Sequence, residues 1–301
     1  MTSGLTPPFL HTPYDGSSLP FTVGLKPIGE DVWLELDAHL AMHLAEKERL
    51  FAADPGAVFR AEAGTEEAQA EVLALVLDNL RDFHSEAYEI RSEEVRIVPA
   101  SRTISHNNAT PLLTAARLVQ EDLVIMREGP DGYRLVAAAL CFPSSWSLTE
   151  KFGKSMAGIH APVPGFNEGR MGQVVARLFD NLKTDQLLCR FNWSIYPDAQ
   201  LHQPLPERVE LSDPDHALAQ LFLRVERQTL RRLAGSGDIL FTIKIHHDPL
   251  KALVEAEDRE RLSRSLQEQL VSLSDDQLSY KGMTRSRDVL VQALERLAAE
   301  G

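Results

Sequence analysis

The sequence predicts an α+β fold in which a five-stranded antiparallel sheet carries helices inserted after its second strand and helical extensions at both ends. Three observations support this class. Helical periodicity is confined to the two ends and one central stretch, strand-length apolar runs occupy the rest, and two pairs of these runs are joined by short hairpin-type turns. With 301 residues, 44% of them hydrophobic, the chain can bury one large core or two modest ones.

The N-terminal part predicts a lead followed by two amphipathic helices. Residues 1–20 are rich in Pro, Gly, Ser and Thr and predict a flexible lead. Residues 31–51 place apolar side chains at three- and four-residue spacings, and Asp-Pro-Gly at 54–56 ends that helix. Residues 65–83 carry a wide apolar stripe and predict a second helix. We expect these two helices to form a cap on the sheet.

Five strand-length runs predict the sheet. Residues 121–127 and 133–142 flank a turn containing Pro-Asp-Gly, which favours a β-hairpin. Three further runs cover 187–196, 221–233 and 239–246. The last two are separated by Ala-Gly-Ser-Gly, a second hairpin signal.

Helices are expected between the second and third strands and again after the fifth. Short helical structure begins in residues 144–152, a proline-rich bend follows at 160–165, and a longer helix covers 171–182. A C-terminal helical region starts after Pro249 and is broken near 281–283. This order of elements is that of a PAS domain, which binds its ligand between the sheet and the inserted helices.

Two boundaries follow from this order. A PAS-like domain with its N-terminal cap would cover residues 21–255, and residues 256–301 would form a helical extension. No repeat of solenoid period is visible in the sequence.

Composition excludes several classes of function. The formal net charge of -13 opposes binding to nucleic acid or to an anionic membrane surface. Cys141 and Cys189 are too few and too far apart to hold an iron–sulfur cluster or a structural zinc ion through thiolates. With no secretion signal and no spanning segment in the sequence, a soluble protein of the cytoplasm is expected.

Four segments together resemble one protein family. They are CFPSSWSLTEKFGKSMAGIHAPVPG at 141–165, FNWSIYPD at 191–198, LRVERQTLRRL at 223–233 and ILFTIKIH at 239–246. With DVWLELD and DPGAVF nearer the N-terminus, the resemblance covers roughly residues 20–255, and its one noted departure is Ala234 in place of a proline. The chain resembles the haem-binding alpha subunit of the haem-dependent oxidative N-demethylases.

The resemblance implies both a cofactor and a reaction. Members of the family resemble PAS domains that hold haem b through a histidine, and they work with a reductase that carries flavin and an iron–sulfur cluster. They remove a methyl group oxidatively from a small methylated amine using O₂, as a monooxygenase-like oxidoreductase. The carbon is released as formaldehyde or passed to a folate-binding partner.

His160 is the residue we expect to bind the iron, because it ends the inserted helix and is followed by the rigid Ala-Pro-Val-Pro. Lys151 and Lys154 precede it by one and two turns and are candidates for contacts with the haem propionates. A solvated position explains both lysines equally well, and His160 without the family would be read as a loop residue. His202 is the second candidate for the axial ligand.

The strand at 221–233 alternates, and its two faces lead to different candidates. Arg227 shares a face with apolar residues, where a buried guanidinium needs an anion or a polar ligand, so it is a candidate donor to reduced oxygen. An ion pair with a nearby carboxylate is the alternative. Glu226 and Gln228 are the polar contacts if the faces are reversed.

The strand at 187–196 adds candidates for the pocket wall. Asn192, Trp193 and Tyr196 are placed to contact haem or substrate, although large aromatic residues in a strand more often pack a core. An amine that loses a hydrogen from its methyl group needs a carboxylate or an aromatic face at its nitrogen, which suits Glu226 and Trp193.

The remaining histidines predict no metal site. His39 and His43 are four residues apart on a helix, but they lack the glutamate of a zinc-protease motif and are expected at the surface. His246 and His247 are adjacent on a strand, so their side chains point to opposite faces and cannot bind one ion together. Phosphate-loop, dinucleotide-binding and hydrolase-elbow motifs do not occur.

Two other functions remain open from the sequence. The first is a haem-based gas or redox sensor, because the PAS fold often serves in sensing, although the chain carries no attached signalling module. The second is a haem-free PAS-like module that binds another ligand.

Overall fold

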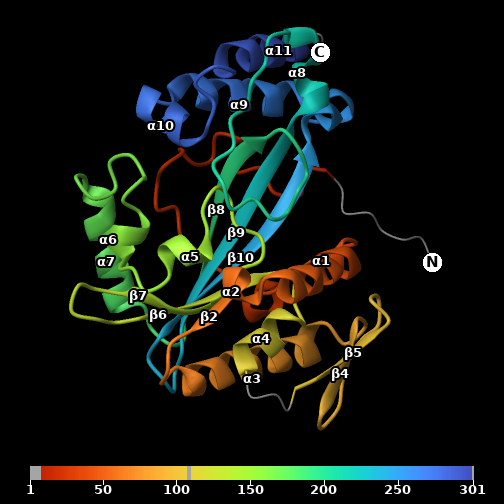
Figure 1. Cartoon of the computed structure of the whole chain (residues 1–301). Coiled ribbons are helices and arrows are strands. Elements are labelled where there is room, and N and C mark those ends of the chain that lie inside the picture. The colour runs from red at the N-terminus through yellow and green to blue at the C-terminus, as the bar shows by residue number, and fades with distance from the viewer. Residues whose placement is uncertain (1–7, 107–109, 300–301) are drawn as a thin grey trace.

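The computed structural model describes residues 8–106 and 110–299, and its centre is a seven-stranded antiparallel sheet in the order β1-β8-β9-β10-β6-β7-β2 (Figure 1). A separate three-stranded sheet has the order β3-β4-β5. The strands are β1 (Lys26–Pro27), β2 (Phe59–Ala61), β3 (Tyr88–Ile90), β4 (Glu94–Ile97), β5 (Arg102–Ser105), β6 (Asp122–Arg127), β7 (Arg134–Ala139), β8 (Leu187–Tyr196), β9 (Phe222–Arg232) and β10 (Ile239–Pro249).

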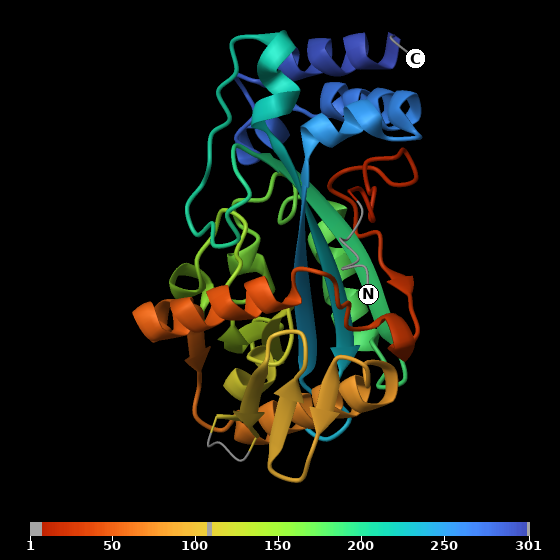
Figure 2. The ribbon, with the colours of Figure 1, turned by 90° about the vertical axis from the view of Figure 1, so that its right-hand side faces the viewer.

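The helices occupy both ends of the chain and the insertion between β7 and β8. They are α1 (Leu40–Ala53), α2 (Pro55–Val58), α3 (Glu66–Phe83), α4 (Pro111–Ala116), α5 (Leu148–Lys151), α6 (Met156–Ile159), α7 (Arg170–Asn181), α8 (Pro214–Gln220), α9 (Arg259–Ser272), α10 (Asp275–Tyr280) and α11 (Arg287–Ala299), with 3₁₀ turns at Glu30–Val32 and Leu250–Glu255. Figures 1 and 2 show α8, α9 and α11 at one end of the long strands, α3 and the small sheet at the other, and α1 between them. No helix of residues 8–106 or 110–299 is both long and apolar enough to cross a bilayer.

All five strands predicted from the sequence are present as β6 to β10. Both predicted hairpins are confirmed, since β6 pairs with β7 and β9 pairs with β10 in antiparallel register. The predicted sheet was nevertheless too small, because the short strands β1 and β2 extend it at its two edges. Two- and three-residue strands leave no alternation for a sequence pattern to detect.

The two faces of the large sheet pack against different parts of the chain. One face, which we call the α3 face, carries Ile125 and Leu240 into a core shared with α3 and α4, and carries Val225 into a core shared with the C-terminal helices. The other, the α7 face, carries Leu230 and Ile243 into a core with the inserted helices α5 to α7. The long strands are therefore covered on both sides.

The first predicted helix begins later than expected. Residues 31–51 were predicted as one helix, but α1 starts only at Leu40. The backbone before it is held by two buried cations from the α3 face of the sheet. Arg227 donates to the carbonyls of Val32 and Trp33, and Lys244 donates to the carbonyl of Glu35 at 2.6 Å. These long-range hydrogen bonds hold the segment before Leu40 in a non-helical path, which a local helical period does not reveal.

The small sheet β3-β4-β5 was not predicted. Its strands are three or four residues long and present charged residues such as Glu89 and Arg96, which ion-pair across neighbouring strands at 3.3 Å. Runs this short and this polar fall below what a hydrophobic pattern can identify. Val95, Ile97 and Ile104 nevertheless anchor the small sheet in the core that contains α3.

The N-terminal lead lies against the fold over the part that is described. Tyr14 is fully buried, and its carbonyl accepts a hydrogen bond of 2.6 Å from Ser265 of α9. Residues 1–7 of the predicted flexible lead lie outside the described residues. At the other end, the predicted break near 281–283 is confirmed as the loop between α10 and α11.

A buried ion pair joins α1 to the sheet. The ammonium of Lys47 is fully buried, lies 3.8 Å from Asp122, and donates to the carbonyls of Val119 and Glu121. Asp122 accepts the backbone N–H groups of Cys141 and Phe142 at 2.8 and 2.7 Å. Those two bonds turn the chain out of the sheet after Ala139, which is why β7 ends three residues before the strand predicted at 133–142.

Replacing Lys47 by methionine is expected to cost roughly 3–5 kcal/mol of folding free energy, because Asp122 would then be a buried charge without a counter-ion. Urea denaturation at pH 7 measures the effect. Lys183→Met, at an exposed position, is the matched control and should change the free energy of unfolding by less than about 0.5 kcal/mol. An equal effect of the two substitutions would show that the buried pair contributes little.

Candidate functional site

The inserted helices place His160 at the edge of the core on the α7 face. Ser155 caps α6 by accepting a hydrogen bond from the backbone N–H of Gly158, and the backbone N–H of Met156 donates to Tyr133 at 2.8 Å. The second bond ties α6 to the residue before β7. His160 follows at the C-terminal end of this four-residue helix. Its position is therefore set by the β6–β7 hairpin and by a capped helical turn.

The imidazole of His160 is held in one tautomer and one orientation. Its Nδ1 lies 2.9 Å from the carbonyl oxygen of Met156, which can only accept, so Nδ1 carries the proton and Nε2 keeps its lone pair. Phe166 stacks on the ring at a centroid distance of 4.3 Å. Burial lowers the pKa of His160, and the positive charges of Arg190 and Lys151 lower it further. A neutral imidazole with one fixed free nitrogen is the form that binds iron.

Polar residues of β8 and β9 share the α7 face with this histidine. Asn192 is paired with Glu226 and Arg190 with Gln228 across the two strands, and all four have the same alternation as Leu230, which packs against the inserted helices. Gln228 donates to Glu226 at 2.6 Å. The predicted alternative, in which Glu226 and Gln228 rather than Arg227 face the inserted helices, is the arrangement that the register produces.

Arg190 is a site residue that sequence reasoning missed. Its side chain is half-buried, its Nε is enclosed, and its guanidinium has no hydrogen-bond or ion-pair partner within residues 8–106 and 110–299. Burial lowers its pKa, which Glu226 and Tyr280 partly offset. An enclosed N–H donor without an acceptor is costly unless a ligand supplies one. The available signal was a charged residue two positions before Asn192, on the same face of the strand.

Tyr196 and the two lysines also lie around the inserted segment. The hydroxyl of Tyr196 is 2.7 Å from that of Ser145, which precedes α5. Lys151 is buried and its ammonium is 2.9 Å from Glu150, whereas Lys154 is exposed. Lys151 is close enough to lower the pKa of His160.

Arg227 and Trp193 lie on the opposite, α3 face of the sheet. The guanidinium of Arg227 donates to backbone carbonyls and lies 3.2 Å from Glu35. The indole Nε1 of Trp193 donates to Gln269 of α9 at 3.1 Å. The structure therefore does not bring these two predicted residues together with His160. The ion pair that the sequence left as the alternative for Arg227 is the one observed.

A concave region lies at the end of β10. A hollow of about 600 Å³ is bordered by α1, by residues 199–202 and by the last residues of β10. Five histidines line it: His39, His43, His202, His246 and His247. His202, the second candidate for the iron ligand, donates from Nδ1 to the carbonyl of Cys141 at 2.8 Å.

Both His39 and His43 were predicted to lie at the surface, and for His43 this prediction is wrong. Its side chain is buried and its Nδ1 accepts a hydrogen bond from Gln120 at 3.0 Å, whereas His39 is exposed as expected. Burial lowers the pKa of His43 to about 3, against the raising influence of Asp37 and with a further lowering by Lys244.

This pKa predicts acid destabilisation. In the unfolded chain His43 takes up a proton near pH 6.5, and in the folded chain only near pH 3. Protonation of the unfolded chain therefore lowers the free energy of unfolding as the pH falls below 6.5. Between pH 7 and pH 5 the unaltered chain should therefore lose about 2 kcal/mol more unfolding free energy than His43→Gln does. His39→Gln is the matched control. Identical pH profiles for the two variants would contradict the buried, neutral state of His43.

The comparison with known protein families identifies one family. A family model described as haem-dependent oxidative N-demethylase, alpha subunit-like, matches residues 24–291. The match spans the large sheet, the inserted helices with His160 and most of the C-terminal helices. The chain belongs to the haem-dependent oxidative N-demethylase alpha subunit-like family.

Proposed function

We propose that this chain binds haem b through Nε2 of His160 and, with that haem, removes a methyl group oxidatively from a small amine using O₂. Electrons would come from a separate flavin and iron–sulfur reductase subunit. The observation that carries the proposal is a neutral imidazole, fixed by Met156 and Phe166, on the same sheet face as the unpartnered guanidinium of Arg190. Membership of the N-demethylase family supports it.

The residues on the α7 face fit a haem. A porphyrin needs apolar surface, an axial donor and a cation for its propionates. Apolar side chains of the inserted helices and of the facing strands are only partly buried here, namely Trp146, Phe152, Ile159, Leu188 and Phe241. The enclosed Nε of Arg190 is an orphaned donor that a propionate would satisfy, and Lys151 adds a second positive charge close to His160.

When bound, the haem supplies the O₂ chemistry, and the chain's own residues position the amine. The carboxylate of Glu226, oriented by Gln228, would hold the protonated amine nitrogen through an ion pair. Asn192 and the hydroxyl of Tyr196 would border the same space and help to orient the methyl group. Arg227 and Trp193 are left out of this proposal because they bond to the scaffold on the other face.

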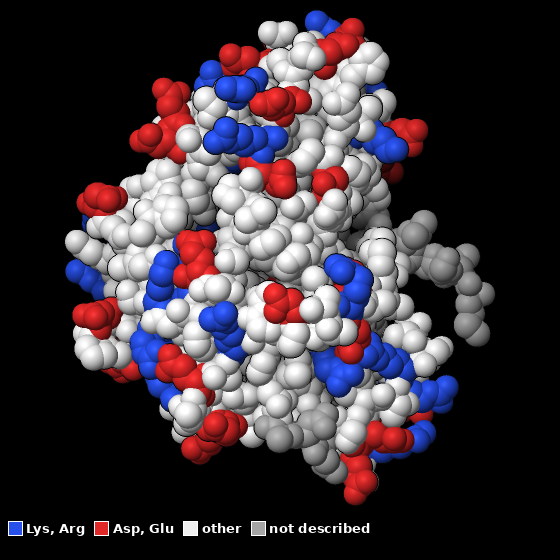
Figure 3. All heavy atoms as spheres, viewed as in Figure 1, with Lys and Arg blue, Asp and Glu red and all other residues white. Residues whose placement is uncertain are grey.

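Overall, the carbon of the methyl group is oxidised by two electrons and leaves as formaldehyde once the C–N bond is broken. One oxygen atom of O₂ ends in the formaldehyde and the other is released as water, with two electrons from the reductase and two protons. Alternatively, a folate-binding partner takes up the carbon, and no free formaldehyde is released. Acidic and basic side chains are interspersed on the face of the molecule that Figure 3 shows.

The axial-ligand assignment predicts that His160→Ala lowers haem affinity by at least about tenfold, because loss of even a supporting group around a metal ligand costs that much. Titration of the purified chain with haem, followed at the Soret band, measures the affinity. His202→Ala is the control and should leave it unchanged. Normal binding by His160→Ala together with loss in His202→Ala would move the ligand to His202.

The amine-binding role predicts that Glu226→Gln lowers kcat/KM for demethylation by about 10–100-fold, as expected for loss of a charged hydrogen bond of about 1.5–3 kcal/mol. The Soret spectrum should stay the same. Formaldehyde release and O₂ uptake with a panel of methylated amines are the readouts. Glu210→Gln, an exposed carboxylate paired with Arg285, is the control. Unchanged kinetics in Glu226→Gln would place the amine elsewhere.

A further inference from the structure

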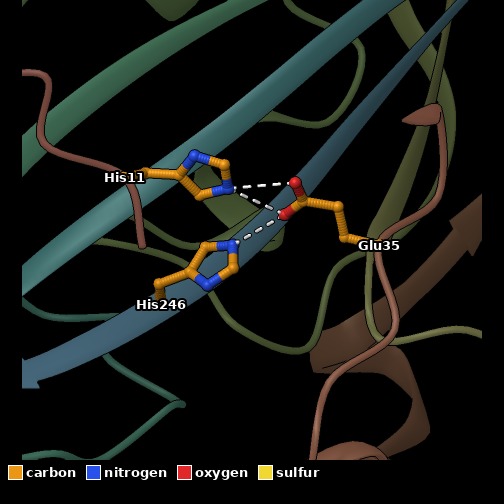
Figure 4. A group of neighbouring side chains, drawn as sticks. All are labelled: His11, Glu35 and His246. Atoms are coloured by element: carbon orange, nitrogen blue, oxygen red, sulfur yellow. Dashed lines mark hydrogen bonds and ion pairs between the residues drawn. The ribbon is translucent and has the colours of Figure 1, made fainter. Parts of the chain in front are cut away.

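Three side chains from distant parts of the sequence converge on the α3 face of the sheet, away from His160. His11 comes from the N-terminal lead, Glu35 from the extended segment before α1, and His246 from β10 (Figure 4). One ligand atom from each lies within 4.8 Å of the other two. Figure 4 shows both imidazole rings directing a nitrogen toward the carboxylate of Glu35.

The separations within this cluster match those of ligands on one cation. His11 Nε2 is 2.9 and 3.0 Å from the two carboxylate oxygens, and His246 Nε2 is 3.1 Å from Oε2. Ligand atoms about 2.1 Å from a cation are about 3.0 Å apart in octahedral geometry and about 3.4 Å apart in tetrahedral geometry. A cation could therefore bind with small side-chain movements, because the donors are already gathered.

The surroundings prepare the donors for a metal. Arg227 lies 3.2 Å from Oε1 of Glu35 and helps to orient the carboxylate, whose two oxygens both contact His11 and whose Oε2 also contacts His246. Imidazole nitrogens and carboxylate oxygens are common ligands of first-row transition cations.

Solvent can reach the cluster, and its three protein ligands leave room for a further ligand on a bound cation. His246 also lines the hollow of about 600 Å³ at the end of β10, so solvent can reach its neighbourhood. Side chains of His11 and Glu35 are 20% and 21% exposed. Two imidazoles and one carboxylate leave at least one coordination position for water, a donor set used for Zn²⁺ and other first-row cations.

We propose that His11, Glu35 and His246 form a binding site for one divalent first-row transition cation, of which Zn²⁺ is the probe of choice. The bound cation clamps the N-terminal lead to β10 and to the segment before α1. This site is separate from the haem proposal, because its three ligands lie on the face of the sheet opposite to His160.

The test uses the full-length, untagged chain after chelator treatment and desalting. Incubation with Zn²⁺, gel filtration and metal analysis should return one Zn²⁺ per chain. His11→Asn and Glu35→Gln should each lower Zn²⁺ affinity at least tenfold in isothermal titration. His39→Asn is the matched control, because it removes an exposed histidine that borders the same hollow and leaves the three donors intact.

A second readout follows the clamp itself. Zn²⁺ should slow amide hydrogen exchange in residues 8–18 of the unaltered chain and of His39→Asn, but not in His11→Asn. His11 is partly exposed, so its variant is expected to fold, which circular dichroism checks. The proposal is overturned if the unaltered chain retains no Zn²⁺, or if His11→Asn and Glu35→Gln bind it as well as the unaltered chain does.

Discussion

Two buried charged side chains hold the backbone at residues 141–144, where the chain leaves the sheet, and the position of the inserted helices depends on them. Asp122 accepts the N–H groups of Cys141 and Phe142. Arg224 donates to the carbonyls of Phe142 and Pro143 at 2.9 and 3.0 Å. Four backbone groups of this turn are thus bonded to charged side chains that are themselves fixed in the sheet.

This arrangement explains why so short a set of helices can be positioned accurately. Helices α5 and α6 have four residues each and would not be stable alone. They follow directly from the fixed turn, and the backbone N–H of Met156 returns to Tyr133 beside β7. His160 is therefore attached at two points to the β6–β7 hairpin, and its geometry depends on the sheet more than on helical propensity.

Much of the fold could be predicted because its long elements have clear periods. Strand β8 spans the same residues as its prediction, and helices α3 and α7 agree within one residue at each end. The extended segment before α1 could not be predicted, because its conformation depends on Arg227 and Lys244, some 200 residues later in the chain. Such long-range bonds override a local helical period.

The orientation of β9 shows how far the sequence could predict the candidate site. Alternation separates Arg227 from Glu226 and Gln228, but the strand is buried on both sides, so polarity alone cannot say which set faces the inserted helices. The cluster of His11, Glu35 and His246 was beyond sequence reasoning for a related reason. Its members are 24 and 211 residues apart, and no spacing rule relates them.

Satisfaction of buried polar groups distinguishes individual arginines of the sheet more reliably than composition does. On the α3 face, Arg227 and Lys244 are fully engaged by carbonyls and by the carboxylates of Glu35 and Asp37. Arg231 on the same face has an unbonded Nε, yet its terminal nitrogen pairs with Glu30 at 3.0 Å.

On the α7 face, Arg190 has no hydrogen-bond or ion-pair partner among the residues that the structure describes, although the charge of Glu226 raises its pKa. Enclosing its Nε–H without an acceptor costs free energy unless a ligand supplies one. Arg190 is therefore a residue whose hydrogen bonding a ligand would complete. The same reasoning separates a structural arginine such as Arg227 from a binding one, although the sequence presents both as charges in apolar strands.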